Sequence, residues 1–471
     1  MVFDNTNKTI DSQNNAVSAI GDDIIDFGKF HSALRSVNLL NCQGHIVRVS
    51  GLTVESSGPK VGIGELCGIN IRDGKRVLAE VVGFHNDRLV LLPLEHIGGI
   101  SPGDTVTSRT SPRMISVSEK ILGRVLNGLG EPIDGKGPLV GDEKMTLDAS
   151  SPSALLRKKI TQPLSLGIRS IDGMLTCGRG QRVGIFAGSG VGKSVLLGDI
   201  ANSSDADVNV VALIGERGRE VREFLEENLG PEGLAKSVVV IAASDSPPIQ
   251  RVKAAFVAVT IAEYFRDKGR NVLFMMDSFT RFAQAQREIG LAAGEPPASK
   301  GYCPSVFALM PRLIERLGNS ENGSITGILT VLVENDDLSD PVADSARSLL
   351  DGHIVLSRKL ADRGHFPAVD VLGSVSRLMS TVASKEHKIA AQKMKEIYAT
   401  YADAEDLINI GAFSAGSNRK IDGAIALIDR LKNFLMQGVR ERTSFNDTVN
   451  QLISIAQVWD ELLTVNVAGK K

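Results

Sequence analysis

The sequence lacks a long apolar run, a cysteine pair and an excess of charge of either sign. No stretch reaches the roughly 18 consecutive apolar residues of a membrane-spanning helix, and the N-terminus has no basic segment followed by an apolar one. Its 53 lysines and arginines balance 55 aspartates and glutamates, which excludes a generally basic nucleic-acid coat protein. We therefore expect a cytoplasmic protein whose contact with a membrane is peripheral.

Cysteine is also scarce. The four cysteines are far apart in the sequence, without a Cys-x-x-Cys pair or a histidine at metal-ligand spacing: Cys42, Cys67, Cys177 and Cys303. This pattern favours isolated buried thiols in a reducing compartment. Aromatic residues make up only 4% of the chain while glycine occurs 47 times, which favours an α/β enzyme with many tight turns over a surface that stacks nucleic-acid bases.

The 471 residues suffice for about three domains. Residues 1–21 are rich in Asn, Asp and Ser and are predicted to be disordered. Apolar residues then recur at helical spacing between Ile24 and Val37, which predicts a short amphipathic helix. This helix either packs on the following domain or docks a partner helix.

Three patterns follow along the chain. Between about 44 and 107, short β-rich runs alternate with turn pairs such as Gly58-Pro59 and Asp73-Gly74, which predicts a small β-barrel. Between about 180 and 380, continuous apolar strands alternate with amphipathic helices, as in a doubly wound parallel sheet. After about 384 the strand signals end. The expected domains are an N-terminal segment (1–40), a barrel (41–112), an α/β domain (113–383) and a helical domain (384–471).

A glycine-rich run follows a predicted strand and opens a predicted helix at residues 187–194. In such a run, backbone N–H groups turn inward around phosphates and the helix N-terminus adds its positive dipole end. Lys193 is expected to reach the β- and γ-phosphates and Ser194 to bind Mg²⁺. The first position departs from the usual glycine. The residues predicted to bind the nucleotide here are Ala187, Gly188, Ser189, Gly190, Val191, Gly192, Lys193 and Ser194.

Two carboxylates lie at other predicted strand ends. Asp277 ends the run RNVLFMMD and is the expected acidic partner of Mg²⁺. Glu216 follows the run VVALIG, at the sheet edge where ligands bind in α/β folds. By periodicity alone Glu216 is as well explained by a solvated surface charge.

Five segments, in this order, give the sequence a family resemblance: GQRVGIFAGSGVGKS, ALIGERGREVREFLE, MMDSFTRFAQAQRE, GEPPASKGYCPSVFALMPRL and FPAVDVLGSVSR. The chain resembles the catalytic subunits of rotary ATP synthases and, more closely, the protein-export ATPases of flagellar and virulence type III secretion. The resemblance extends from about residue 44 to the C-terminus. It implies a RecA-like P-loop NTPase core between an N-terminal barrel and a C-terminal helical domain, and ATP and Mg²⁺ as ligands.

The resemblance also implies roles for single residues. Glu216 becomes the carboxylate that polarises the attacking water, and Arg217 a neighbour that positions Glu216 or the γ-phosphate. Asp277 becomes the Mg²⁺ acid, with Arg281 near the same site. Arg377 aligns with the arginine finger that enters the neighbouring subunit's site. Tyr302 matches a tyrosine near the nucleotide, where it is either a wall of the site or part of the core.

The implied assembly is a homohexameric ring, because Lys193, Glu216 and Arg377 all belong to one chain. The implied partners are a regulatory stalk protein at the N-terminal helix, a central stalk protein, export substrates and chaperones, and a membrane export gate at the inner membrane. No nucleic acid is expected.

The sequence departs from the synthase pattern in two places. Leu332 stands where an aromatic residue would face adenine and no Phe follows the FLMQ run at 434–437, so we expect apolar contact with adenine without stacking. The segment IGAFSAGSNRKIDGA replaces the acidic motif of the synthase β-subunits. Flagellar export is the favoured system, with virulence export, a synthase β-type subunit, a non-hydrolysing ring subunit and a hexameric helicase as alternatives.

Overall fold

The computed structural model describes residues 43–95, 98–109, 114–139, 141, 143–333 and 340–464. The N-terminal segment 1–40 and its predicted helix lie outside these residues. Among the described helices, none has the length and apolar character that crossing a membrane requires.

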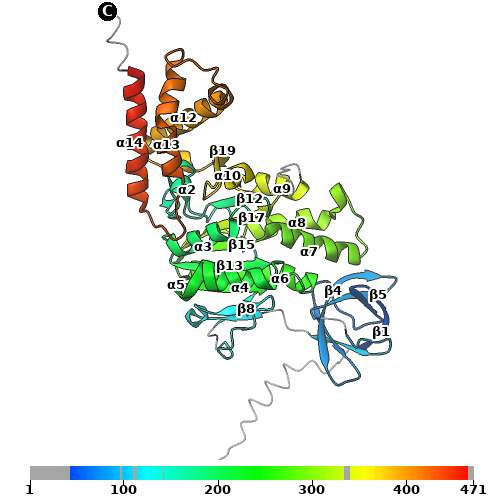
Figure 1. Ribbon diagram of the computed structural model, residues 1–471. Coiled ribbons are helices and arrows are strands. Elements are labelled where there is room, and N and C mark those ends of the chain that lie inside the picture. The colour runs from blue at the N-terminus through cyan, green and yellow to red at the C-terminus, as the bar shows by residue number, and fades with distance from the viewer. Residues whose placement is uncertain are drawn as a thin grey trace, which may run out of the picture. The chain divides into compact units, whose positions relative to one another are not determined.

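The first described strands close a six-stranded antiparallel barrel, drawn in blue in Figure 1. Its core is formed by inward-facing side chains such as Val54, Cys67 and Val81, none of which is exposed. Asn86 and Asp87 have φ of 47° and 61° at the tight turn of one hairpin, a conformation that these two residue types tolerate. The strands are β1 (Gln43–Ser50), β2 (Thr53–Ser56), β3 (Leu66–Asn70), β4 (Arg76–His85), β5 (Arg88–Pro93) and β6 (Thr105–Arg109).

The large sheet has the strand order β19-β18-β12-β17-β15-β13-β14-β8, and only β19 is antiparallel to its neighbour along this path. Short strands flank it: β16 (Gly318–Asn319) on β17, and the pairs β7 (Met114–Val117) with β9 (Glu143–Thr146) and β10 (Pro163–Leu164) with β11 (Cys177–Gly178). The path strands are β8 (Val125–Asn127), β12 (Arg182–Ala187), β13 (Val208–Ile214), β14 (Ser237–Ala242), β15 (Asn271–Asp277), β17 (Ser324–Leu332), β18 (Gly352–Leu356) and β19 (Val369–Ser376).

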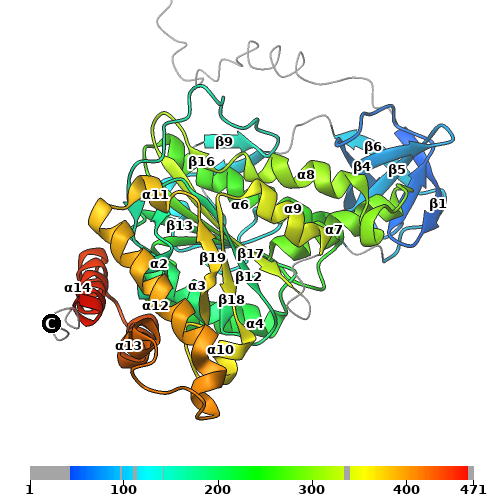
Figure 2. The same ribbon diagram turned by 90° about the horizontal axis from the view of Figure 1, so that it is seen from above.

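Both faces of this sheet are covered, so its strands are apolar at successive positions. Phe274 and Met276 of β15 face one core cluster, whereas Leu273 and Met275 face the other. Helices α6 (Pro248–Asp267), α7 (Phe279–Ala292) and α8 (Pro304–Ile314) supply the first cluster, and α2 (Arg169–Met174) and α3 (Lys193–Ser203) supply the second (Figure 2).

The remaining helices before the C-terminal ones are short. They are α4 (Gly218–Glu223), α5 (Gly230–Ala235), α9 (Pro341–Leu349), α10 (Arg358–Asp362) and α11 (Met379–Val382), with single turns at Glu119–Ile121 and Ser299–Gly301 and a π-helical turn at Phe224–Leu229.

Three long helices end the chain and pack on one another: α12 (Lys385–Asn409), α13 (Arg419–Leu435) and α14 (Phe445–Thr464) (Figure 1). Trp459 is 1% exposed and lies so close to α13 that a Cβ on Gly423 would meet its ring at 2.9 Å. The predicted fold class, a RecA-like core with a β-barrel and a helical C-terminal domain, is confirmed. The boundaries at 112 and 383 stay predictions.

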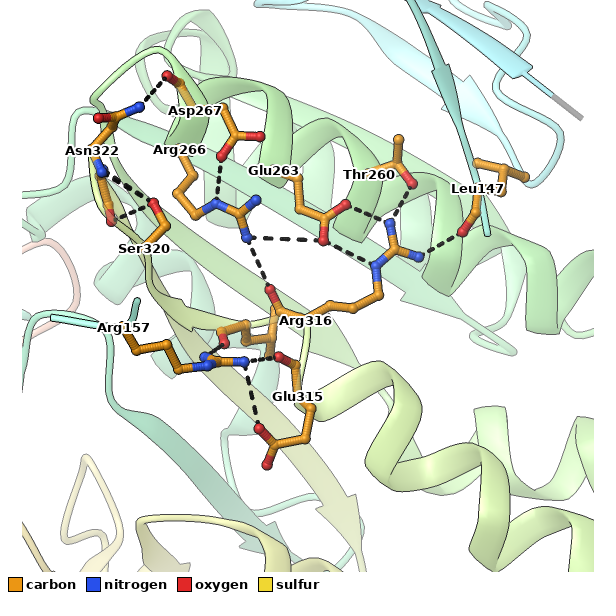
Figure 3. Close-up of polar contacts among 12 residues, drawn as sticks. Leu147, Arg157, Thr260, Glu263, Arg266, Asp267, Glu315, Arg316, Ser320 and Asn322 are labelled. Carbon is orange, nitrogen blue, oxygen red and sulfur yellow. Dashed lines mark hydrogen bonds and ion pairs between the residues drawn. The ribbon is translucent and has the colours of Figure 1, made fainter. Parts of the chain in front are cut away.

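A buried ion pair joins α6 to the turn after α8 (Figure 3). The Arg316 guanidinium donates to both carboxylate oxygens of Glu263, at 3.0 and 2.5 Å, and to the Thr260 hydroxyl and the Leu147 carbonyl. The side chains of Arg316 and Glu263 are 3% and 2% exposed. Because a buried charge is tolerated only when it is paired, this pair fixes the segment around Leu147 against α6.

We predict that Glu263→Gln lowers the free energy of unfolding by about 3–5 kcal/mol, because it leaves the Arg316 charge buried without a counter-charge. Arg363→Met is the matched control: its pair with Glu405 at 3.0 Å is half exposed, so its loss costs less than about 1 kcal/mol. Urea denaturation of both variants measures the difference. Equal losses of stability in the two variants would contradict a stabilising role of the buried pair.

Candidate active site

The glycine-rich run forms a loop between β12 and α3, as expected of a phosphate-binding loop. Gly190 and Gly192 have φ of 79° and 84°, a left-handed conformation that side chains disfavour. Ala187 is the buried last residue of β12, and Val191 is 2% exposed inside the core. The predicted departure at Ala187 therefore falls on the strand, before the turn begins.

Three charged groups meet where the loop opens into α3. The Lys193 ammonium lies 2.5 Å from Asp277 Oδ1 and 3.7 Å from Glu216 Oε1. The side chains of Lys193, Glu216 and Asp277 are only 12%, 14% and 5% exposed. The structure thus brings together three of the predicted site residues from three different parts of the sequence.

The parallel sheet explains this convergence. Asp277 ends β15 and Glu216 comes two residues after β13, and these two strands are neighbours in parallel register. The Thr330 hydroxyl, on the next strand, donates to Asp277 Oδ1 at 2.8 Å. Carboxyl ends of parallel strands meet at one edge, which is where ligands bind in such folds.

The buried, charged surroundings of the cluster shift the pKa of Glu216. Burial raises the pKa of its carboxyl group to about 7, and the Asp277 charge contributes, while Lys193 acts in the opposite direction. A carboxyl group with a pKa near neutrality can accept and return a proton at physiological pH.

A buried donor beside this cluster tests whether an anionic ligand fits. Arg281 packs over Gly215, where an added Cβ would meet the Arg281 side chain at 2.8 Å. Its Nε is buried and has no hydrogen-bond partner among the described residues. Together with Lys193 and the loop amides, Arg281 gives the site the donors that a nucleotide phosphate needs. Ser194 follows Lys193 on α3, and its hydroxyl and the Asp277 carboxylate would be oxygen ligands of the kind that Mg²⁺ prefers.

Two predicted site residues do not join the cluster. The Arg217 side chain is 78% exposed and pairs with Glu220 at 3.3 Å. Tyr302 is 5% exposed, with its ring against Phe307 and under the Arg287 guanidinium. Their contributions to the site stay predictions.

Arg377 lies at the other end of the sheet. It follows β19, and its backbone N–H donates to the carbonyl of Asp351, which precedes β18. The parallel strands begin at that end, whereas Lys193 follows their carboxyl end. The Arg377 side chain is exposed, and Nη2 donates to the Arg347 carbonyl at 3.1 Å.

A pocket of about 640 Å³ adjoins the phosphate loop. Phe366, 44% exposed, lines it beside Gly192, and Met436, Gln437 and Val439 from the segment after α13 form another wall. The backbone N–H of Gln437 donates to the Phe366 carbonyl at 2.9 Å.

Leu332, the residue expected to contact adenine, lies elsewhere, and its contact with the base stays a prediction. Leu332 does not line the pocket; this residue ends β17, where its N–H donates to the Thr280 hydroxyl. An aromatic side chain that does line the pocket is Phe366, which was not among the residues predicted from the sequence. The available signal was its position at the start of FPAVDVLGSVSR, next to the expected finger segment.

Comparisons with known proteins agree with this geometry. Residues 167–376 match the nucleotide-binding domain of the ATP synthase alpha/beta family, and residues 46–109 match the beta-barrel domain of the same family. Residues 383–454 match the T3SS EscN ATPase C-terminal domain.

Individual relatives are similar over most of their length. The flagellum-specific ATP synthase of Bacillus subtilis is 52% identical over 88% of this chain and 94% of its own. The type 3 secretion system ATPase of Xanthomonas euvesicatoria is 48% identical over 88% and 93%. The assembled ATPase EscN of enteropathogenic E. coli superposes with a TM-score of 0.84 at 46% identity, covering 88% of this chain and all of that one.

These matches confirm the family that the sequence motifs predicted. The chain belongs to the ATP synthase alpha/beta family and, within it, to the branch of the flagellum-specific and type III secretion ATPases.

Proposed function

We propose that this chain is an ATPase that energises or primes protein export through the flagellar type III secretion apparatus. Family membership supports the enzyme class, and the flagellum-specific relative in Bacillus subtilis supports the system. One observation carries hydrolysis as opposed to binding alone: the Glu216 carboxylate lies 3.7 Å from the phosphate-loop lysine and has a pKa near 7.

The phosphate groups of ATP would bind to the loop amides of residues 188–193, to the Lys193 ammonium and to the Arg281 guanidinium. Ser194 and Asp277 would hold Mg²⁺, which when bound neutralises charge on the phosphates. Glu216 would orient the attacking water and accept its proton, and the low exposure of the cluster would exclude other water molecules. The base would lie against Phe366.

The position of Arg377 supports a site shared between subunits. Within its own chain this exposed residue is at the opposite end of the sheet from Lys193, so it can complete only the site of another copy. A homohexameric ring satisfies this requirement at every interface. The relative EscN has been described as an assembled ATPase, and also in complex with its central stalk EscO, which supports a ring and a stalk partner for this chain.

The proposal extends to the location of the protein in the cell and to its binding partners. The protein would work in the cytoplasm, at the periphery of the inner membrane. Its N-terminal segment would bind a regulatory stalk protein, and the ring would receive export substrates and chaperones beside the membrane export gate. Virulence-type secretion is the second candidate function, favoured by the 48% identity to the Xanthomonas euvesicatoria enzyme.

We predict that Glu216→Gln lowers kcat for hydrolysis by about 10²–10⁴-fold, while MgATP still binds.

Arg377→Ala should lower kcat by about 10³–10⁵-fold. An equimolar mixture of the two variants should regain activity that neither has alone, since some interfaces then combine an intact Glu216 with an intact Arg377. Steady-state hydrolysis measures all three, and a mixture without activity would contradict the shared site.

The pKa of Glu216 predicts a pH profile. Because water activation needs the ionised carboxylate, kcat/KM for MgATP should rise with pH through about 7. Glu220 raises this pKa by its charge and hydrogen bond, so Glu220→Gln should move the rise to lower pH. A profile that is flat from pH 5.5 to pH 8.5 would remove Glu216 as the base.

Phe366→Ala should weaken nucleotide binding by about 5–150-fold, since stacking of a base on an aromatic ring contributes about 1–3 kcal/mol. Phe84→Ala is a matched control, because this barrel residue is 56% exposed and does not line the pocket. Titration with a fluorescent ATP analogue gives the dissociation constants. Weak binding by Leu332→Ala with normal binding by Phe366→Ala would instead support Leu332 as the residue that contacts adenine.

A further inference from the structure

Gln181 is a buried amide that no step of the proposed hydrolysis uses. It directly precedes β12 and none of its surface is exposed. Its Nε2 donates to the Asp351 carbonyl at 3.0 Å and to the Ser376 hydroxyl at 3.1 Å, and its Oε1 accepts from the Gly178 N–H at 2.8 Å. A fully bonded amide in an apolar interior defines the positions of its partners.

Both acceptors of this amide are next to Arg377. The Asp351 carbonyl that accepts from Gln181 also accepts the backbone N–H of Arg377, at 3.0 Å. Ser376 is the residue before Arg377, and its hydroxyl donates to the Thr176 carbonyl at 2.8 Å. Gln181 therefore fixes the backbone from which the exposed Arg377 side chain extends.

Neighbouring contacts hold the same turn. The Arg182 backbone N–H, Nε and Nη2 all donate to the Asp351 carboxylate, at 3.0 to 3.2 Å. At Gly352 an added Cβ would lie 2.6 Å from the Val375 carbonyl and 3.3 Å from Gln181 Nε2, so the two strands and the amide are in close contact. Such support is what keeps a long cationic side chain in one working position.

The sheet separates this turn from the chain's own phosphate loop. Gln181 precedes the first residue of β12 and the loop follows the last, Ala187, which at about 3.3 Å per residue is roughly 20 Å away. A substitution at Gln181 therefore acts first on Arg377, and reaches Lys193 only if β12 itself moves.

We propose that Gln181 is a positioning residue for Arg377, and so controls hydrolysis in the active site of the neighbouring subunit and not in its own. This inference rests on the proposed function, in which Arg377 completes the site of another copy. It predicts that Gln181 behaves genetically and kinetically like Arg377, although the two side chains are not in contact.

The test uses the full chain with Gln181→Met, which keeps the size of the side chain and removes the amide. Ser376→Ala is a milder second variant that removes only the hydroxyl between Gln181 and Thr176. Thr326→Val is the matched control: it removes the buried hydroxyl that accepts from the Gly180 N–H at 2.8 Å, and it touches neither Asp351 nor Ser376. Measurements are steady-state hydrolysis, the affinity for a fluorescent ATP analogue, and hydrolysis by pairwise mixtures of variants.

For Gln181→Met we expect kcat to fall about 10²-fold with unchanged nucleotide affinity, because a catalytic group displaced by about 1 Å loses this much. Mixing it with Glu216→Gln should restore activity, since about one interface in four then has both an intact Glu216 and a well-placed Arg377. Mixing it with Arg377→Ala should restore nothing. Ser376→Ala should behave like Gln181→Met in both mixtures, with a smaller loss of kcat. Thr326→Val should hydrolyse ATP like the wild type.

Two results would overturn the inference. Full activity in both Gln181→Met and Ser376→Ala would show that Arg377 needs no such support. Restoration of Gln181→Met by Arg377→Ala, but not by Glu216→Gln, would show that Gln181 acts on its own phosphate loop. If the reference mixture of Glu216→Gln with Arg377→Ala has no activity, the shared site itself fails and this inference fails with it.

Discussion

The contact of Lys193 with Asp277 and Glu216 is the interaction on which the rest of the site depends. Three ionisable groups, all less than 15% exposed, tolerate burial because the ammonium lies between the two carboxylates. Asp277 ends β15, Glu216 comes two residues after β13, and Lys193 begins α3 after the loop that follows β12, so the cluster forms only when these strands belong to one parallel sheet. Apolar side chains on both faces of these strands pack into the two core clusters and hold the sheet between its covering helices.

Local patterns in the sequence were sufficient to predict that Lys193, Asp277 and Glu216 lie together. The loop at 187–194 has its own glycine spacing, and Asp277 and Glu216 stand at the ends of unbroken apolar runs, which are typical of strands buried on both faces. Since strand ends in a parallel sheet share an edge, residues far apart in sequence could be assigned to one site. The barrel and the C-terminal helices were predictable for the same reason, because each has a distinct periodicity.

Features that depend on where a side chain points were not predictable in this way. Leu332 is the last residue of a predicted strand, and nothing local shows that its backbone is held by Thr280 while Phe366, from a loop after β18, lines the pocket. Arg217 directly follows Glu216, yet its side chain extends to solvent toward Glu220. Arg316 and Gln181 resemble surface residues in the sequence, and only the packing of distant segments buries them.

The pocket beside the phosphate loop is lined by residues from two parts of the chain. Phe366 lies between α10 and β19, whereas Met436, Gln437 and Val439 follow α13, and the Gln437 backbone N–H donates a hydrogen bond to the Phe366 carbonyl. If the base binds in this pocket, as proposed above, a movement of the segment after α13 relative to Phe366 would change the space around it. Nucleotide affinity and the position of the helical domain would then be linked in both directions, because binding that favours one position is itself strengthened by that position.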